Sequence, residues 1–150
     1  LAAALLGFMK FNWEPAKIYL GDAGSMVLGI IIGSLTILGD YSVYNDLGFI
    51  SGIMILSIPI FDMVYVIILR LLKKKSPFFG SPDHFALRLR KKYGLSTSRT
   101  ISIILVMQLI LCGLVIFNFY TDKTVTIIST LAVALFFGVF GAILARVKME

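Results

Sequence analysis

The sequence predicts an all-α, polytopic membrane protein with about four transmembrane helices and the end of a preceding one. Hydrophobic residues make up 59% of the 150 residues, while charged residues make up only 15%. The mean hydropathy of +0.96 lies outside the range of ordinary soluble domains. The apolar residues form long runs, and the basic residues are confined to the connecting segments and the ends of the runs. This separation is typical of helices that cross a bilayer.

Four apolar segments are the expected membrane spans. Crossing about 30 Å of hydrocarbon takes about 20 apolar helical residues. The segments that meet this length, or nearly so, are residues 23–38, 47–72, 100–119 and 125–145. The first segment is short and rich in glycine, so we expect it to depend on neighbouring helices to cover its backbone.

The chain opens on residues 1–9, an apolar stretch about half as long as a membrane span. We therefore expect it to be the tail of a helix whose beginning is missing. Residues 1–150 are then predicted to form a single transmembrane domain that is the C-terminal part of a larger protein.

Lysine and arginine give the expected orientation, because short cytoplasmic loops are enriched in both. Residues 73–99 carry a dense group of basic residues, whereas residues 39–46 carry aspartates and no base. Residues 73–99 are therefore predicted to be a cytoplasmic loop. Alternation of the spans then puts the turn at residues 120–124 outside and returns residues 10–22, like the C-terminal end, to the cytoplasm.

The net charge of +6 predicts a negatively charged partner. Aromatic residues do not interleave with the bases as they do on a nucleic-acid stacking platform, so we expect no nucleic acid. Anionic membrane lipids are the expected partner. The single cysteine, Cys112, can form no disulfide framework within this chain and is interpreted as a packing residue.

Residues 12–25 carry the pattern that points to chemistry. Pro15 disfavours a helix at the residue before it, and Gly21 and Gly24 permit a sharp turn or close approach of the backbone to a ligand. Asp22 falls where the helix of the first span should begin. Its carboxylate fits a helix N-cap. It also fits a ligand for a hard cation such as Mg²⁺ with bound phosphates, beside helix N-terminal amides that favour anions.

A longer ordered motif includes this turn, and its residues are Asn12, Pro15, Ala16, residues 21–25, Leu28 and Gly29. The motif resembles the block N-x-x-P-A-x-x-F-x-G-D-x-G-S-x-x-L-G of the polyprenyl-phosphate N-acetylhexosamine-1-phosphate transferases. This family of membrane enzymes includes undecaprenyl-phosphate GlcNAc-1-phosphate transferases and phospho-MurNAc-pentapeptide translocases. Residues 59–62, Arg70 and residues 76–78 also resemble landmarks of its GlcNAc branch. The resemblance covers nearly the whole chain and corresponds to the C-terminal half of a typical member.

The resemblance implies an activity. In this family the phosphate of a polyprenyl phosphate attacks the β-phosphorus of a UDP-N-acetylhexosamine, here with UDP-GlcNAc as the favoured donor, and UMP is released. The family uses Mg²⁺, with Mn²⁺ as an alternative ion, and Asp22 matches its metal-binding catalytic aspartate. Asn12 and Tyr19 match positions that face the nucleotide, where Tyr19 replaces a more usual Phe. The implied location is the cytoplasmic face of the bacterial inner membrane, and the implied role is an early step of cell-envelope glycan synthesis, such as that of lipopolysaccharide or teichoic acid.

Residues 80–89 correspond in part to the histidine motif of the family, commonly D-R-x-H-x-H-H-R-L. His84 matches the first histidine and Arg88 the arginine, while Ala86 and Leu87 stand in place of the other two histidines. Imidazole and guanidinium groups both donate hydrogen bonds to phosphate. His84 and Arg88 are therefore predicted to bind substrate, with a solvated surface histidine as the alternative for His84.

One departure from the family concerns catalysis. Relatives carry an adjacent Asp-Asp pair in an earlier cytoplasmic loop, and no Asp-Asp occurs in this sequence. We therefore expect this chain by itself to lack transferase activity.

Two other classes of protein stay open. The missing pair favours a non-catalytic membrane scaffold or split relative, and an ionisable Asp62 within a span would suit a transporter subunit.

Two further features concern packing. Pro59 is expected to kink its helix and free a backbone carbonyl. For Asp62, a structural role as a polar contact between helices is favoured slightly over a catalytic role. Glycines four residues apart permit close approach of helices, and a homodimer through the same faces is a further expectation. The two glycine pairs are Gly29 with Gly33 and Gly48 with Gly52.

Overall fold

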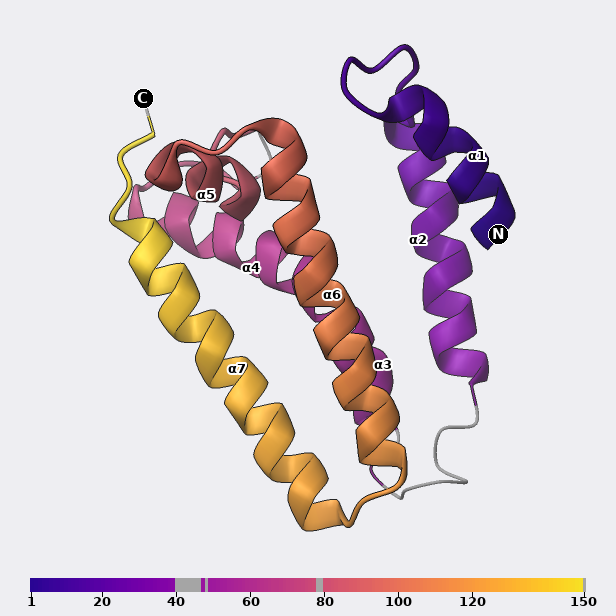
Figure 1. Cartoon of the computed structure of the whole chain (residues 1–150). Helices are drawn as coiled ribbons and strands as arrows, with labels where there is room; N and C mark the ends of the chain where they lie inside the picture. The colour runs from indigo at the N-terminus through magenta and orange to yellow at the C-terminus, as the bar shows by residue number, and fades with distance from the viewer. Residues whose placement is uncertain (40–46, 48, 78–79, 150) are drawn as a thin grey trace. The chain divides into compact units, whose positions relative to one another are not determined.

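The computed structural model describes residues 1–39, 47, 49–77 and 80–149, and these residues form seven α-helices and no strand (Figure 1). The helices are α1 (Ala2–Asn12), α2 (Gly21–Leu38), α3 (Phe49–Ile55), α4 (Ser57–Leu72), α5 (Phe85–Tyr93), α6 (Thr97–Phe119) and α7 (Lys123–Ala145). The predicted all-α class is thus confirmed. Most of the 39–46 segment, whose lack of bases supported the orientation, lies outside the described residues.

Within the described residues, three helices are long and apolar enough to cross a membrane, namely α2, α6 and α7. They correspond to the first, third and fourth predicted spans. They begin at residues 21, 97 and 123, slightly earlier than predicted, and end at the predicted residues 38, 119 and 145. Most of their apolar side chains face outward, as is expected of helices that a bilayer surrounds. The multi-pass membrane architecture is confirmed.

The prediction that residues 47–72 form a single helix is wrong, because the helix is interrupted at Leu56 and divides into α3 and α4. The cause is Pro59, whose ring nitrogen has no N–H to bond the carbonyl of Ile55 four residues earlier. Gln108 of α6 donates from Nε2 to that carbonyl at 2.9 Å. The predicted kink and freed carbonyl are therefore confirmed, and an amide from a neighbouring helix satisfies the carbonyl.

The chain divides into two compact units, Leu1–Gly39 and Asp40–Glu150. In the first unit, α1 and α2 are joined by residues 13–20, and neither helix contains a buried residue. The second unit contains α3 to α7 and the buried core. Each unit is described by itself below.

In the second unit, α4, α5 and α7 meet around an aromatic core. The ring centroid of Phe61 lies 5.3 Å from that of Tyr65, 5.6 Å from that of Phe85 and 4.8 Å from that of Phe137. A Cβ added at Gly141 of α7 would lie 3.2 Å from the Phe61 ring and 3.3 Å from the Tyr65 ring. The close approach of α7 to α4 therefore depends on this glycine.

The glycine pairs singled out in the sequence stay predictions. Within its own unit, a Cβ added at Gly29 or Gly33 would meet no atom within 4 Å, and Gly48 lies outside the described residues. Cys112 is partly buried, with its Sγ 3.6 Å from Gln108 Nε2. This position agrees with the packing role expected for Cys112.

The predicted loop at residues 73–99 contains a helix, α5, which the sequence pattern did not predict. α5 buries Phe85, Arg88 and Leu89 and exposes a basic face. It ends at Gly94, whose φ of +61° suits the left-handed conformation of a helix C-cap. In Figure 1, α5 lies across the end of the unit where α6 begins and α7 ends.

Candidate active site

The first candidate residues lie where α1 ends and α2 begins (Figure 1). Asn12, the last residue of α1, donates from Nδ2 to the Ile18 carbonyl at 2.9 Å. This bond closes residues 13–20 into a loop over the end of α1. Gly21 has a φ of +66°, which residues with a side chain rarely adopt. The chain therefore turns sharply into α2 at a position that only glycine occupies without strain.

Asp22 is the second residue of α2, and its side chain is exposed. The N-cap is Leu20, so the alternative in which Asp22 itself is the N-cap is wrong. Ser25 Oγ donates to the Asp22 backbone carbonyl at 2.9 Å, which fixes the first turn of the helix. The carboxylate thus stands near the positive end of the helix dipole, open to a ligand.

The donor set around Asp22 is small. Among the described residues, no group of three or more His, Cys, Asp and Glu side chains could hold a metal ion. A single exposed carboxylate still fits Mg²⁺, because this ion is often held by one or two carboxylates together with substrate phosphates and water. Tyr19, three residues before Asp22, is 80% exposed. The loop therefore brings an aromatic face and a carboxylate to the same end of the first unit.

His84 lies in the second unit, immediately before α5, and is paired with Asp62 of α4. His84 Nδ1 is 2.7 Å from Asp62 Oδ2, and Asp62 Oδ1 accepts the Phe85 N–H at 3.0 Å. The His84 side chain is 49% exposed and that of Asp62 is 26% exposed. The contact between helices that was favoured for Asp62 is confirmed. Its partner was missed, because the sequence separates the two residues by 22 positions.

An apolar groove of about 570 Å³ adjoins this pair. Asp62 and His84 line it together with Pro59, Met63, Val66, Ile67 and Pro77. The half-exposed imidazole therefore stands at the edge of a hydrophobic surface. This arrangement differs from a histidine surrounded only by solvent.

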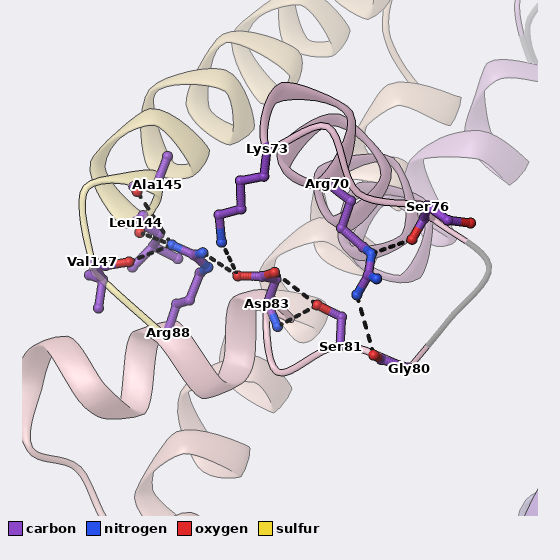
Figure 2. A network of polar contacts seen from close by, with 10 residues as sticks. All are labelled: Arg70, Lys73, Ser76, Gly80, Ser81, Asp83, Arg88, Leu144, Ala145 and Val147. Atoms are coloured by element: carbon purple, nitrogen blue, oxygen red, sulfur yellow. Dashed lines mark hydrogen bonds and ion pairs between the residues drawn. The ribbon is translucent and has the colours of Figure 1, made fainter. Parts of the chain in front are cut away.

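Arg88 points the other way, into the protein, and its side chain is 1% exposed. Its guanidinium pairs with the Asp83 carboxylate and donates to the backbone carbonyls at the end of α7. These carbonyls belong to Leu144, Ala145 and Val147, at 3.1, 3.3 and 2.7 Å (Figure 2). The geometry does not support the substrate contact predicted for Arg88, because the guanidinium is occupied within the fold, where it caps the negative end of the α7 dipole.

Asp83 is the centre of this buried network. Its carboxylate also accepts from Lys73 Nζ at 2.8 Å and from Ser81 Oγ at 2.9 Å. Burial alone would raise the pKa of Asp83, but the hydrogen bonds from Lys73, Arg88 and Ser81 hold it well below its usual range. The network therefore stabilises the fold at neutral pH and loses that contribution as acid protonates Asp83.

The sequence pattern did not predict this network. Arg70, also buried, donates from Nε to the Ser76 carbonyl at 2.6 Å and from Nη1 to the Gly80 carbonyl at 3.3 Å (Figure 2). The one available indication was an acidic residue, Asp83, within a strongly basic segment. Such a residue is expected to find a cationic partner when it is buried.

The chain resembles known proteins along much of its length. Residues 1–40 match the model of the family described as glycosyl transferase family 4. A probable undecaprenyl-phosphate N-acetylglucosaminyl 1-phosphate transferase of Bacillus subtilis (strain 168) is 38% identical over 102 residues, which is 68% of this chain and 28% of that protein. A phospho-N-acetylmuramoyl-pentapeptide-transferase of Clostridium kluyveri is 32% identical over 112 residues, which is 75% of this chain and 33% of that protein.

A third relative, an undecaprenyl-phosphate alpha-N-acetylglucosaminyl 1-phosphate transferase of Thermotoga maritima, is 34% identical over 83 residues, or 55% of this chain and 26% of that protein. No solved structure is significantly similar to the chain. The chain is thus related to membrane transferases that are named for polyprenyl-phosphate or cell-wall precursor substrates. It is a relative of the polyprenyl-phosphate N-acetylhexosamine-1-phosphate transferases, as its motifs indicated. The matched region spans about a third or less of the length of these relatives.

Proposed function

We propose that this chain supplies part of the active site of a membrane transferase. The enzyme moves N-acetylhexosamine 1-phosphate, with GlcNAc 1-phosphate favoured, from a UDP-sugar to a polyprenyl phosphate and releases UMP. It acts at the cytoplasmic face of the bacterial inner membrane, in an early membrane step of cell-envelope glycan synthesis. The observation that carries the proposal is the exposed Asp22 carboxylate in the first turn of α2, within residues 1–40, which match the family model.

In the proposed reaction, a phosphate oxygen of the lipid forms a bond to the β-phosphorus of the nucleotide sugar. The bond from that phosphorus to the oxygen bridging the α- and β-phosphates breaks, and UMP leaves with the electron pair. A bound Mg²⁺ would reduce the repulsion between the two phosphates and the charge on the departing UMP. Asp22 would provide a carboxylate oxygen to this ion, and the nearby helix N-terminus favours the phosphates themselves.

The other residues have supporting roles in this proposal. Asn12 closes the loop that presents Tyr19, and the exposed ring of Tyr19 offers a face on which the uracil base stacks. His84 Nε2 contacts a substrate phosphate. Arg88 holds the end of α7 and the segment before α5, so its effect on substrate is indirect.

Substitution of Asp22 tests the proposal. In a membrane transferase that contains this chain, Asp22→Asn should remove most turnover while the protein still inserts and folds. Binding of Mn²⁺, followed by its electron paramagnetic resonance spectrum, should weaken in parallel. Asp122→Asn is the matched control, because Asp122 is an exposed carboxylate before α7. Near-normal turnover and Mn²⁺ binding in Asp22→Asn would eliminate Asp22 as the metal ligand.

A non-catalytic scaffold remains the second candidate, because the sequence contains no Asp-Asp pair and the described residues contain no cluster of potential metal ligands. We expect the chain alone to show no turnover. Addition of a complementing segment that bears an acidic pair should restore turnover if the chain belongs to an enzyme. Failure with a correctly folded complement would favour the scaffold. The transporter alternative gains no support, since Asp62 is bonded to the start of α5.

A further inference from the structure

We propose that Asp62 is a positioning residue for His84. It fixes the imidazole ring in one orientation and one tautomer, so that Nε2 is presented to a phosphate-bearing substrate at the edge of the adjoining apolar groove. The identity of that substrate rests on the proposed function. The orientation and tautomer of His84 do not, and they can be measured separately.

The geometry of the Asp62 carboxylate supports this role. Oδ1 of Asp62 accepts the Phe85 N–H at 3.0 Å, which leaves Oδ2 facing His84 Nδ1 at 2.7 Å. An ionised carboxylate can only accept hydrogen bonds, so Nδ1 must carry a proton. The opposite nitrogen, Nε2, is then the one left for a ligand. It accepts a proton when the ring is neutral and donates to phosphate when the ring is charged.

The backbone beside His84 is anchored without the contact to Asp62. Asp83, the preceding residue, is held in the buried network by Arg88 and Lys73. The partly exposed pair of His84 with Asp62 adds little to stability by comparison, as is usual for exposed ion pairs. A carboxylate placed on Nδ1 of a half-exposed histidine beside a groove is instead the arrangement that orients a functional imidazole.

The lining of the groove also supports this role. Asp62 and His84 are the polar residues among its lining, and the rest of the lining is apolar. An apolar wall excludes water from one side of the ring and strengthens a hydrogen bond from Nε2 to an anionic group. His84 therefore offers Nε2 to a phosphate, and the apolar lining of the groove offers a hydrophobic surface beside it.

The experiment uses the fact that His84 is the only histidine in the chain. The chain is produced with ¹⁵N-labelled histidine and studied in detergent micelles. The two ring nitrogens are observed by NMR in alkaline buffer, so that the tautomer of the neutral ring is measured. The proposal expects the proton on Nδ1 in the wild-type chain. A wild-type ring with its proton on Nε2 would overturn the proposal, whatever the variants do.

Asp62→Asn supplies the second measurement. An asparagine has one oxygen and one NH₂ group, so it cannot place an acceptor at both of the positions that Oδ1 and Oδ2 of Asp62 occupy. We expect the tautomer balance to move toward Nε2–H in Asp62→Asn and to be restored at least in part in Asp62→Glu. Asp122→Asn, which removes a carboxylate before α7, should leave the spectrum unchanged. An unchanged balance in folded Asp62→Asn would refute the positioning role.

Turnover separates this proposal from the function on which it rests. In an active transferase that contains this chain, Asp62→Asn should lower kcat by about tenfold or more, by analogy with the loss when the carboxylate partners of metal-bound histidines are removed. The KM for the lipid should change less. If the wild-type ring has its proton on Nδ1 but Asp62→Asn keeps an undiminished kcat, the positioning role is overturned and the proposed role of Asp22 is unaffected. If Asp22→Asn keeps an undiminished turnover, the proposed role of Asp22 is overturned. The tautomer measurement on His84 is unaffected by that result, because it does not involve Asp22.

Discussion

Replacement of Arg88 by methionine tests whether its buried guanidinium holds together the end of the unit where α4, α5 and α7 meet. Methionine keeps a long side chain against the Tyr65 ring, which the guanidinium carbon approaches to 6.0 Å from its centroid. The change removes the charge and the fork of donors. Asp83, which is 7% exposed in the wild-type chain, loses its arginine partner, and the carbonyls of Leu144, Ala145 and Val147 lose a common donor.

The size of the effect follows from these contacts. Loss of one partner of a buried ion pair typically costs about 3–5 kcal/mol, because the other charge remains buried. Lys73 Nζ lies 2.8 Å from Asp83 Oδ1 and is 38% exposed, so Asp83 keeps one cationic partner in the variant. We therefore expect a loss of unfolding free energy at the lower end of this range, about 3 kcal/mol. Arg88→Met combined with Asp83→Asn removes the stranded charge. The double variant should therefore be more stable than the sum of the two single changes by about 1 kcal/mol or more.

The assay is thermal or denaturant unfolding of the chain in detergent micelles, followed by circular dichroism. Arg90→Ala is the matched control, because Arg90 lies on the same helix but is exposed. It should change the free energy of unfolding by no more than about 0.5 kcal/mol. If Arg88→Met costs less than about 1 kcal/mol, or no more than Arg90→Ala, the conclusion that Arg88 acts as an internal anchor is refuted.

Two further predictions concern helix packing. Gly141→Ala should destabilise the chain by about 1–3 kcal/mol, because the added methyl group overpacks against Phe61 and Tyr65. Gly138→Ala is the control: an added Cβ there meets no atom within 4 Å, so this change should stabilise α7 by about 0.5–1 kcal/mol. Equal effects of the two substitutions on unfolding would contradict the close approach of α4 and α7. Gln108→Leu should cost about 1 kcal/mol, because the Ile55 carbonyl that Pro59 leaves free loses its donor. An unchanged unfolding midpoint would show that the carbonyl needs no partner.

Hydropathy was sufficient to predict three of the membrane helices, since the ends of α2, α6 and α7 coincide with the ends of the apolar runs. The second run is also strongly apolar but contains Pro59, and the lost backbone bond decides its division into α3 and α4. The sequence indicated this kink. It did not show that Gln108, 53 positions away, would satisfy the freed carbonyl.

The candidate site was predictable only where its residues are close in sequence. Asn12, Tyr19 and Asp22 form one ordered motif, and the structure gathers them at one end of a helical hairpin. The pairing of His84 with Asp62 and the burial of Arg88 depend on how α4, α5 and α7 pack, which no local pattern specifies. α5 itself was missed because its nine residues carry many charges and only a narrow apolar face.

The short segment around the start of α5 alternates between buried and exposed polar side chains. Asp83 and Arg88 point inward, where they are 7% and 1% exposed, while His84 between them is 49% exposed. The two kinds of variant should therefore separate cleanly by measurement. Loss of Arg88 should appear first in the free energy of unfolding, and its effect on turnover should follow the unfolded fraction. Loss of His84 should lower turnover while the unfolding curve stays close to that of the wild type, because the Asp83 network that anchors the segment remains intact.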